Sequence, residues 1–431
     1  MIGVLQGKWP QRRVVRCLLC ILLSCDGTGA RNRVDELRDK LHIDFEPYDL
    51  GNRSPSDAAE IVLSQISSSL QDRLSKTFAK ATSSECRAKI AQHLGYFVNA
   101  IGKEESLPFT DVEFTNECDE PVYDWTDLPD GMHIGDIQNR TYQPPRNETV
   151  YLEDPSDLKL LYGILPHDDP VATIRLIDVL YEEGHQFVIH VDARFDDTQQ
   201  SLLKYSADKH YVRVLPDTQR VRVNWGGFSM VNVTLQLLRY STSLDFHKFI
   251  HLSASAYPLA SNSEIRHRLA SYPLNANFFQ LIMKPSRQVN TGWHYFVECD
   301  DALHRIYQLP PLRRQTSHID LFTSSQWFIL SHDFAQYIAE SKPGSFASDY
   351  LRYIEHVVVA DETYFGTVLR NTKFCHHHHN DNFLHLQFDR WESDLPAAKR
   401  DARKCPMPDP DHCGRSPTTM TIDYADILEL S

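Results

Sequence analysis

The feature that most constrains this chain is an alternation of short apolar runs with amphipathic helical patterns, which begins near Leu158. The apolar runs have the length of strands and cover residues 160–165, 187–191, 211–215 and 248–252. Apolar residues at helical spacing cover residues 171–181 and 229–240. Because such alternation produces a parallel sheet with helices on both faces, the sequence predicts an α/β fold with a central, mostly parallel sheet.

Residue types at the ends of these runs locate a crevice. Asp169 and Pro170 suit the start of the first helix, and Gly184 can end it. Ligands of parallel sheets bind beyond the carboxyl ends of the strands. The positions expected to converge there are His167, Asp192, Trp225, Gly226, Gly227, Phe228 and Ser253. The first strand is not followed by a Gly-x-Gly-x-x-Gly string, which argues against a dinucleotide-binding fold.

The first 30 residues have the pattern of a signal or anchor segment. An apolar run from Val14 to Cys25 is accompanied by basic residues on its N-terminal side and followed by small residues at 27–30. This run has 12 residues, whereas a bilayer-spanning helix needs about 20. A cleaved signal, a short type II anchor and a buried core helix therefore all remain open.

Residues 31–150 differ in character from the α/β region after them. Their first half is polar with helical patterns at residues 73–79 and 88–94, and their second half is irregular and rich in Pro, Asp and Asn. We expect a small helical stem and a wrapping linker without chemistry of their own. The expected catalytic domain covers residues 151–417, and residues 418–431 form a tail.

Charge and cysteine content restrict partners and compartment. The net charge of −14 and the pI near 5.8 disfavour a broad grip on nucleic acid or anionic lipid. Six cysteines lie beyond the first 30 residues, which permits fifteen pairings, with Cys405 and Cys413 forming the favoured local pair and free buried thiols as the alternative. Acceptor strings for N-glycosylation begin at Asn52, Asn139, Asn147 and Asn232, the last inside an expected helix.

The strongest functional signal is an ordered series of short strings. Asp361 and Glu362 are adjacent carboxylates between an apolar run and an expected helix, where a carboxylate can take a proton from a substrate hydroxyl. Upstream lie the strings at residues 225–230, 251–259, 298–300 and 325–330. Over about residues 158–417 the series resembles the core 2/I branching N-acetylglucosaminyltransferases and peptide O-xylosyltransferases. Residues 298–305 and 411–417 favour the xylosyltransferase branch.

This resemblance implies a GT-A nucleotide-sugar fold, a UDP-sugar donor and no metal cofactor. It implies that His167 and Asp192 lie near uridine and ribose, that Glu362 is the base, and that Asp361 orients it or caps the helix. The corner at residues 190–194 lacks an Asp-x-Asp string, and the one at residues 409–411 lies within the cysteine hairpin.

Without a metal, cationic side chains must stabilise the leaving diphosphate. The resemblance assigns this role to Arg390, where the family has an Arg-Lys pair and this chain has Arg390 and Trp391. The missing ammonium is replaced from a nearby basic cluster, with Lys399 as the candidate and Arg400, Arg403 and Lys404 as alternatives. Trp327 is expected to form part of the sugar or acceptor wall.

The resemblance also implies a disulfide pairing, an activity and a cellular location. Cys299 and Cys375 are each expected to pair with one of Cys86 and Cys118. The implied activity is inverting transfer of xylose from UDP-xylose to a protein serine, by an enzyme held in the Golgi membrane with its catalytic part in the lumen, or secreted if the N-terminal segment is cleaved.

Some residues depart from the family pattern. Ala256 stands where the family often has Asp, and Gln326 stands where the xylosyltransferases have Asp. These departures keep two alternatives open: transfer of N-acetylglucosamine or glucuronate to a glycan hydroxyl, and an inactive lumenal glycan-binding protein. The four histidines at residues 376–379 are interpreted as a solvated loop rather than a metal site.

Overall fold

The computed structural model describes residues 76–103, 114, 116–118, 149–282, 294–308 and 321–385. Several sequence predictions lie outside these residues: the signal or anchor segment, the pattern before residue 76, the Cys405–Cys413 pair and the C-terminal tail. The same holds for Arg390 and Lys399. In the described ranges, every helix is too short or too polar to cross a bilayer.

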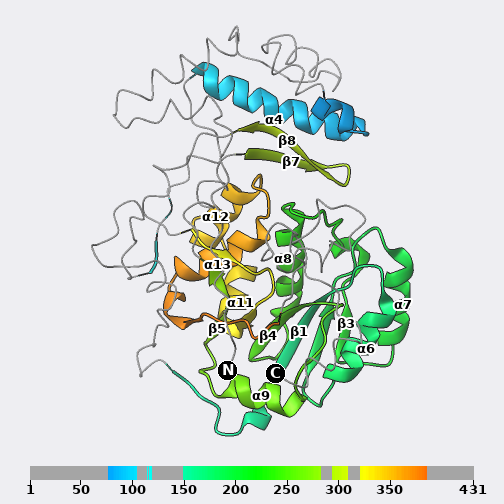
Figure 1. The fold of residues 1–431 in the computed structure, drawn as a ribbon, viewed down its shortest axis with the longest axis vertical. Helices are drawn as coiled ribbons and strands as arrows, with labels where there is room; N and C mark the ends of the chain where they lie inside the picture. Colours follow the sequence, from blue (N-terminus) through cyan, green and yellow to red (C-terminus); the bar gives the residue numbers. More distant parts are fainter. Residues whose placement is uncertain are drawn as a thin grey trace, which may run out of the picture.

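A seven-stranded sheet forms the centre of the molecule (Figure 1), in the order β11-β5-β10-β4-β1-β2-β3. Its parallel part comprises β1 (Leu160–Leu165), β2 (Gln186–Ile189), β3 (Val212–Val214) and β4 (Lys248–Ser253). These four strands match the four predicted apolar runs, and the predicted mostly parallel α/β sheet is confirmed.

The sequence did not predict the other side of the sheet. It comprises β5 (Asn277–Phe278), β10 (Ile329–Ser331) and β11 (His378–His379). Strand β10 runs antiparallel to both β4 and β5, whereas β11 runs parallel to β5. Strands of two or three residues are too short to show a period of two, so only the tertiary structure defines them.

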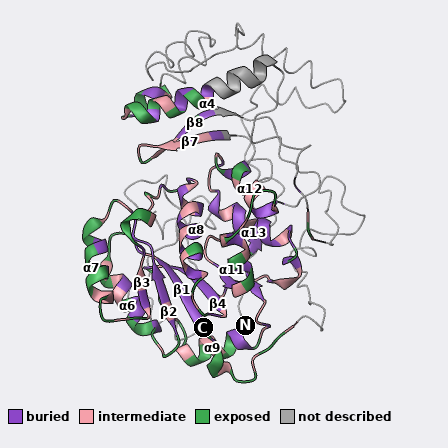
Figure 2. Ribbon diagram, turned by 180° about the vertical axis from the view of Figure 1, so that it is seen from behind, coloured by how far each residue is buried: buried purple, intermediate pink, exposed green. Residues whose placement is uncertain are grey.

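Helices cover both faces of the sheet, and the alternation along β1 divides the core between them. Leu161 packs with α8 (Ser229–Ser241), α11 (His332–Ala339), α12 (Phe346–Ile354) and α13 (Asp361–Arg370). Tyr162 and Ile164 face the opposite core with α6 (Pro170–Leu180), α7 (Asp196–Ser206) and α9 (Asn262–Ala270). The strands are buried, while α7 and α9 expose their outer faces (Figure 2).

The predicted start of α6 is confirmed in atomic detail. The side chain of Asp169 accepts hydrogen bonds from the amides of Val171 and Ala172, and Pro170 occupies the first helical position. The helix ends at Leu180, earlier than predicted, and Gly184 lies in the following turn with φ +88°. Glycine suits that turn because it adopts positive φ without a Cβ clash.

A second layer lies at one end of the molecule (Figure 1) and contains part of the predicted stem. Helix α4 (Ser84–Lys103) packs on the hairpin of β7 (His294–Cys299) and β8 (Ala302–Gln308). The carboxylate of Asp300 accepts hydrogen bonds from the hydroxyl and amide of Ser83 and from the amide of Thr82, which hold its pKa at about 2. The helical pattern predicted at residues 88–94 lies within α4, as expected.

Two disulfides confirm the pairing that the resemblance implied. Cys86 is bonded to Cys299, which attaches α4 to the hairpin, and Cys118 is bonded to Cys375. Near the second bridge, Phe114 contacts the rings of Phe346, Tyr350 and Tyr353.

The interpretation of residues 376–379 as a solvated loop is wrong. His378 is buried, lies in β11 beside β5, and has its Nε2 3.1 Å from the carbonyl oxygen of Phe279. Burial lowers its pKa to about 3, so the ring is neutral. The run of four polar histidines suggested exposure to solvent, but a strand at the edge of a sheet can be polar and still bury one face.

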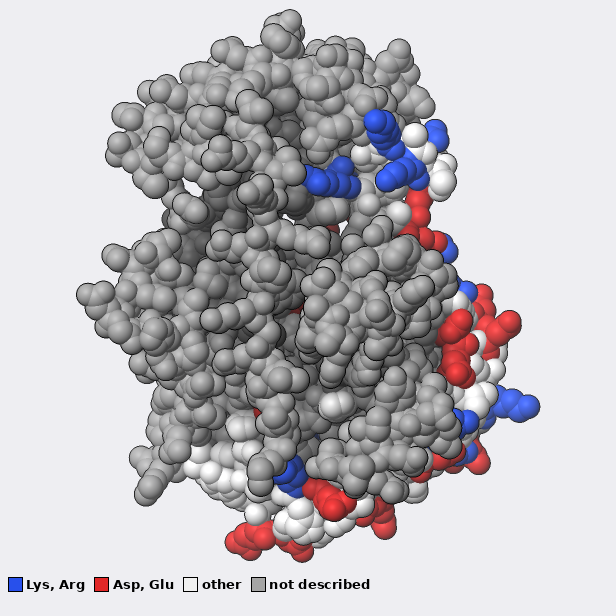
Figure 3. All heavy atoms as spheres, viewed as in Figure 1, with Lys and Arg blue, Asp and Glu red and all other residues white. Residues whose placement is uncertain are grey.

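Acidic side chains gather near α7 on the face shown in Figure 3, with basic side chains among them. This mixed surface agrees with the negative net charge of the chain.

We predict that Cys118→Ser combined with Cys375→Ser lowers the free energy of unfolding by about 2–5 kcal/mol, because the bridge closes a loop across 257 residues. Denaturant titration of the variant and the wild type measures the difference. A reductant should remove this difference between the two proteins. Equal stabilities without reductant would contradict the assigned bridge.

Candidate active site

The carboxyl ends of β1 and β4 lie together, as the sequence predicted. The amide of Ala254, just beyond β4, donates to the carbonyl of Leu165 at the end of β1 over 3.1 Å. The hydroxyl of Ser253 is 2.5 Å from that of Ser255. Nearby on β4, the ring of His251 packs against Trp327 with 5.0 Å between ring centroids. Ser253 and Trp327 therefore belong to the same end of the sheet.

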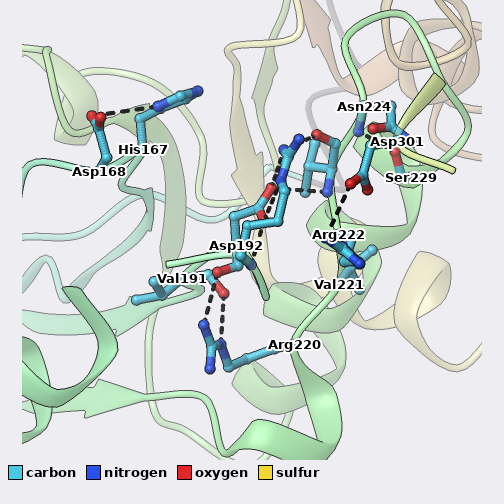
Figure 4. A network of polar contacts seen from close by, with 12 residues as sticks. His167, Asp168, Val191, Asp192, Arg220, Val221, Arg222, Asn224, Ser229 and Asp301 are labelled. Carbon is cyan, nitrogen blue, oxygen red and sulfur yellow. Dashed lines mark hydrogen bonds and ion pairs between the residues drawn. The ribbon is translucent and has the colours of Figure 1, made fainter. Parts of the chain in front are cut away.

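The corner after β2 is organised around Asp192 (Figure 4). One carboxylate oxygen accepts hydrogen bonds from the amide and Nε of Arg194, both at 2.9 Å. The other accepts from Nη2 of Arg194 at 2.6 Å and from the amide of Val223 at 2.9 Å. Although burial raises the pKa of this carboxyl, these contacts outweigh it and lower the pKa below its usual value. Four donors fill the lone-pair positions of a carboxylate.

Neighbouring side chains hold the segment opposite this corner. The amide of Val221 donates to Nε2 of His190 at 2.8 Å, and Arg220 donates to the backbone oxygens of Val191 and Asp192. Burial lowers the pKa of His190 to about 4, so its Nε2 remains an acceptor at neutral pH. The loop after β2 and residues 220–223 thus form one hydrogen-bonded unit.

His167 lies on the outer side of the same corner. Its exposed ring is 5.2 Å from that of Phe195, whose amide donates to the carbonyl of Asp192 over 3.0 Å. The structure thus brings His167 and Asp192 to one corner, as expected from their places after adjacent parallel strands. They differ in how readily a ligand could contact them: the side chain of His167 is exposed to solvent, whereas the carboxylate of Asp192 accepts hydrogen bonds from protein donors.

The turn before α8 is built around a carboxylate from the other layer. Glu298 of β7 accepts hydrogen bonds from Nδ2 of Asn224 and from the amide of Ser229, both at 2.9 Å. A Cβ on Gly227 would lie 2.6 Å from the carboxyl carbon of Glu298, so glycine is required for this approach. A negative charge at this position also complements the dipole of α8.

The same turn contacts the segment that leads into α13. Gly226 has φ +75°, and its carbonyl accepts a hydrogen bond from the amide of Val359 at 2.7 Å. Val359 itself has φ +57°, which is unusual for a β-branched residue. This bond connects the loop of Trp225, whose side chain is 57% exposed, to a point three residues before Glu362.

The two carboxylates at the start of α13 occupy different surroundings. Glu362 is half-buried, whereas Asp361 is 2% exposed and packs inward. Neither carboxyl oxygen of Asp361 has a side-chain hydrogen-bond partner in the described part of the chain, and Ala360 occupies the N-cap position of α13. Desolvation, followed by the charge of Glu362, raises the pKa of Asp361 to about 7.

Comparison with known proteins identifies the family of the chain. Residues 164–411 match the Core-2/I-Branching enzyme family. The chain belongs to this family. The matched region begins near the end of β1 and includes β2, β3, β4 and α13, so it contains the corner, the turn and the adjacent carboxylates described above.

Curated relatives of the chain include xylosyltransferases. Xylosyltransferase 1 of Rattus norvegicus is 26% identical over 248 residues, covering 55% of this chain and 29% of the relative. Xylosyltransferase 2 of Homo sapiens is 26% identical over 235 residues, covering 52% and 26%. Xylosyltransferase oxt of Drosophila melanogaster is 30% identical over 220 residues, covering 49% and 24%. The chain thus spans less than a third of the length of these relatives.

The sequence patterns did not reveal several groups that shape the candidate site. Glu298 was noticed only as part of a string, and no role was expected for Arg194. A further cation, Arg222, is 3.0 Å from Asp301 and remains largely exposed. Basic residues near position 222 were a signal, but only the folded chain places them beside the corner (Figure 4).

Two groups of described residues have the composition of a metal site, and both contain a disulfide. They comprise Cys86 and Cys299 with His304, and Cys118 and Cys375 with His376. Sulfur atoms bonded to each other are not the thiolates that metals bind. These groups are therefore disulfides packed against histidines.

We predict that Gly227→Ala lowers the free energy of unfolding of the protein by about 1–3 kcal/mol, because the new methyl group meets the carboxylate of Glu298. The loss of unfolding free energy caused by Gly227→Ala should persist in a Glu298→Gln background, because glutamine has the same shape as glutamate. It should diminish in a Glu298→Ala background, because alanine removes the side chain that the new methyl group meets. Denaturant unfolding of the single and double variants measures this coupling. Equal costs in all three backgrounds would show that the contact does not limit the turn.

Proposed function

We propose that this Core-2/I-Branching enzyme transfers xylose from UDP-xylose to a protein serine with inversion and without a metal ion. The observation that carries the proposal is the position of Glu362. It is the second residue of α13, after Asp361, whose side chain packs against the carboxyl end of the parallel sheet, and the Val359–Gly226 bond links the start of this helix to the turn before α8. The named xylosyltransferase relatives support the reaction class.

In this mechanism Glu362 accepts the proton of the acceptor hydroxyl as its oxygen attacks the anomeric carbon. The oxygen–carbon bond forms on the face opposite the bond to the diphosphate, so the configuration inverts and UDP leaves. A half-buried carboxylate in the first turn of a helix suits this role, since a negative charge there complements the helix dipole. In general-base catalysis by a glutamate, a carboxylate oxygen is the proton acceptor.

The donor site in the proposal is the corner formed by His167 and Asp192. Asp192 acts there through Arg194, because its carboxylate is already occupied by protein donors. Arg390 neutralises the diphosphate, with Lys399 supplying the second positive charge. Trp225, Gly226 and Ser253 line the crevice, and Trp327 provides a sugar-facing wall.

A second candidate within the reaction class is transfer of N-acetylglucosamine or glucuronate to a glycan hydroxyl. Gln326 favours it, because this departure from the family pattern lines the same small cavity as Asp361. An inactive glycan-binding protein is the candidate from another class. A panel of UDP-sugars, tested for turnover and for thermal stabilisation, distinguishes all three.

The proposed setting is the secretory pathway, with the catalytic part in the Golgi lumen and the N-terminal segment as anchor or cleaved signal. The two disulfides support an oxidising compartment.

We predict that sugar transfer continues in excess EDTA, because the mechanism uses cationic side chains in place of a metal. Initial rates with and without EDTA measure this. A loss of activity that added Mn²⁺ restores would overturn the metal-free mechanism.

We predict that Glu362→Gln lowers kcat by roughly 10²- to 10⁴-fold while leaving the affinity for UDP nearly unchanged, since it removes only the proton acceptor. Arg390→Ala should weaken UDP binding by about 1.5–3 kcal/mol, as expected for loss of a charge-assisted contact. Initial rates and calorimetric titration of UDP separate the two effects.

The matched control for the base is Glu355→Gln, the same chemical change at an exposed glutamate. It should leave kcat unchanged. Near-normal turnover of Glu362→Gln would remove Glu362 as the base.

A further inference from the structure

Two buried polar side chains that the mechanism does not use line one small cavity. Asp361 extends from the first turn of α13, and His251 extends from β4. Each is only 2% exposed. Both carboxyl oxygens of Asp361 and Nε2 of His251 lack a hydrogen-bond partner among the described residues. Buried polar groups of this kind are normally satisfied by protein or by an internal water.

The hydrogen-bonding state of His251 follows from its other ring nitrogen. Nδ1 lies 2.9 Å from the carbonyl oxygen of Gln326, which can only accept, so Nδ1 carries the proton. Burial lowers the pKa of His251 to about 4, which keeps the ring neutral at physiological pH. Nε2 is therefore an acceptor that needs a donor from the cavity.

The remaining walls that the described residues form supply no charge to Asp361. They are formed by Leu165, Val223, Met230, Val233, Thr234, Gln326 and Phe365. Within the described part of the chain, the ionisable groups that face Asp361 are thus His251, from β4, and Glu362 on its own helix. The cavity volume of about 20 Å³ leaves room for about one water molecule, which is too little to hydrate an ionised carboxylate fully.

We propose that Asp361 is a protonated internal acid that shares one bound water with His251, and that this pair positions Glu362. In the proton-holding state, Asp361 donates to the water and the water donates to Nε2 of His251. The contact docks the first turn of α13 against β4. The positioning role rests on the proposed function of Glu362, whereas the shared proton site does not.

Loss of the proton has two consequences for the site. It leaves an anion against apolar walls, and it places a second negative charge beside Glu362. Burial raises the pKa of Asp361 to about 7, and the charge of Glu362 acts in the same direction. The docked first turn is therefore maintained below neutral pH and weakened above it, which gives sugar transfer a falling limb at high pH.

The effect on stability has a definite sign. The pKa of Asp361 is about 7 in the folded protein, above the ordinary value of 3.8 for an aspartate. The unfolded chain therefore releases this proton first, so the folded state loses stability relative to the unfolded state as the pH rises from about 4 to about 7, and the loss levels off above that. Asp361→Asn keeps the shape and cannot ionise, so it should gain stability relative to wild type as the pH rises.

Thermal unfolding tests this without reference to activity. We expect the midpoint of Asp361→Asn minus that of wild type to increase by several degrees between pH 5 and pH 8.5. The matched control is Asp197→Asn, an exposed carboxyl on α7, for which the same difference should stay constant. Titration of the other groups is common to the proteins and cancels. A constant difference for Asp361→Asn would overturn the proposal.

Infrared difference spectra test the pair directly. Wild type minus Asp361→Asn should show the carbonyl band of a protonated carboxylic acid at pH 6, replaced by carboxylate bands at pH 8.5. His251→Asn retains a donor for the Gln326 carbonyl but lacks Nε2, so it should shift this titration to lower pH. An unchanged midpoint would remove His251 from the pair.

The pH profile of sugar transfer tests the link to Glu362. The falling limb at high pH should disappear in Asp361→Asn. A uniform decrease in kcat with the limb retained would overturn the positioning role. If Glu362 is not the base, Glu362→Gln stays active, but the expected thermal and infrared results are still obtained. A failure of the proposed base can therefore be distinguished from a failure of the proposed proton site.

Discussion

The carboxylate of Glu298 is the contact on which the arrangement of the site depends. It comes from the outer hairpin and is bound by Asn224 and the first amide of α8, against the bare backbone of Gly227. The same turn accepts the amide of Val359, which precedes the carboxylates of α13. One charged group thus fixes three segments that are far apart in the sequence.

Sequence patterns predicted the parts of the fold that local physics determines. The four parallel strands are apolar because both their faces are buried, and the start of α6 is marked by Asp169 and Pro170. The side of the sheet formed by β5, β10 and β11 was not predictable, since β5 and β11 have two residues each. For the same reason His378 was assigned to solvent although partner strand β5 buries it.

For the candidate site, the sequence predicted which residues lie together but not the contacts that they make. The rule for parallel sheets placed His167 and Asp192 at one corner because it depends only on strand order. It could not reveal that Arg194 and Val223 already occupy the carboxylate of Asp192. The sequence does not reveal the cavity beside Asp361, because residues from distant elements form its walls. Its interest lies in the polar atoms of Asp361 and His251 that have no hydrogen-bond partner among the described residues.

The bridge between Cys86 and Cys299 has a consequence for the order of assembly. The two cysteines are separated by 213 residues, and Cys299 directly follows Glu298. During synthesis, α4 emerges early but has no sulfur partner from β7 until the parallel strands and α8 have all been made. The disulfide of α4, the first long helix of the described chain, therefore forms late. It can form only after β7, the strand that contains Glu298, has been synthesised.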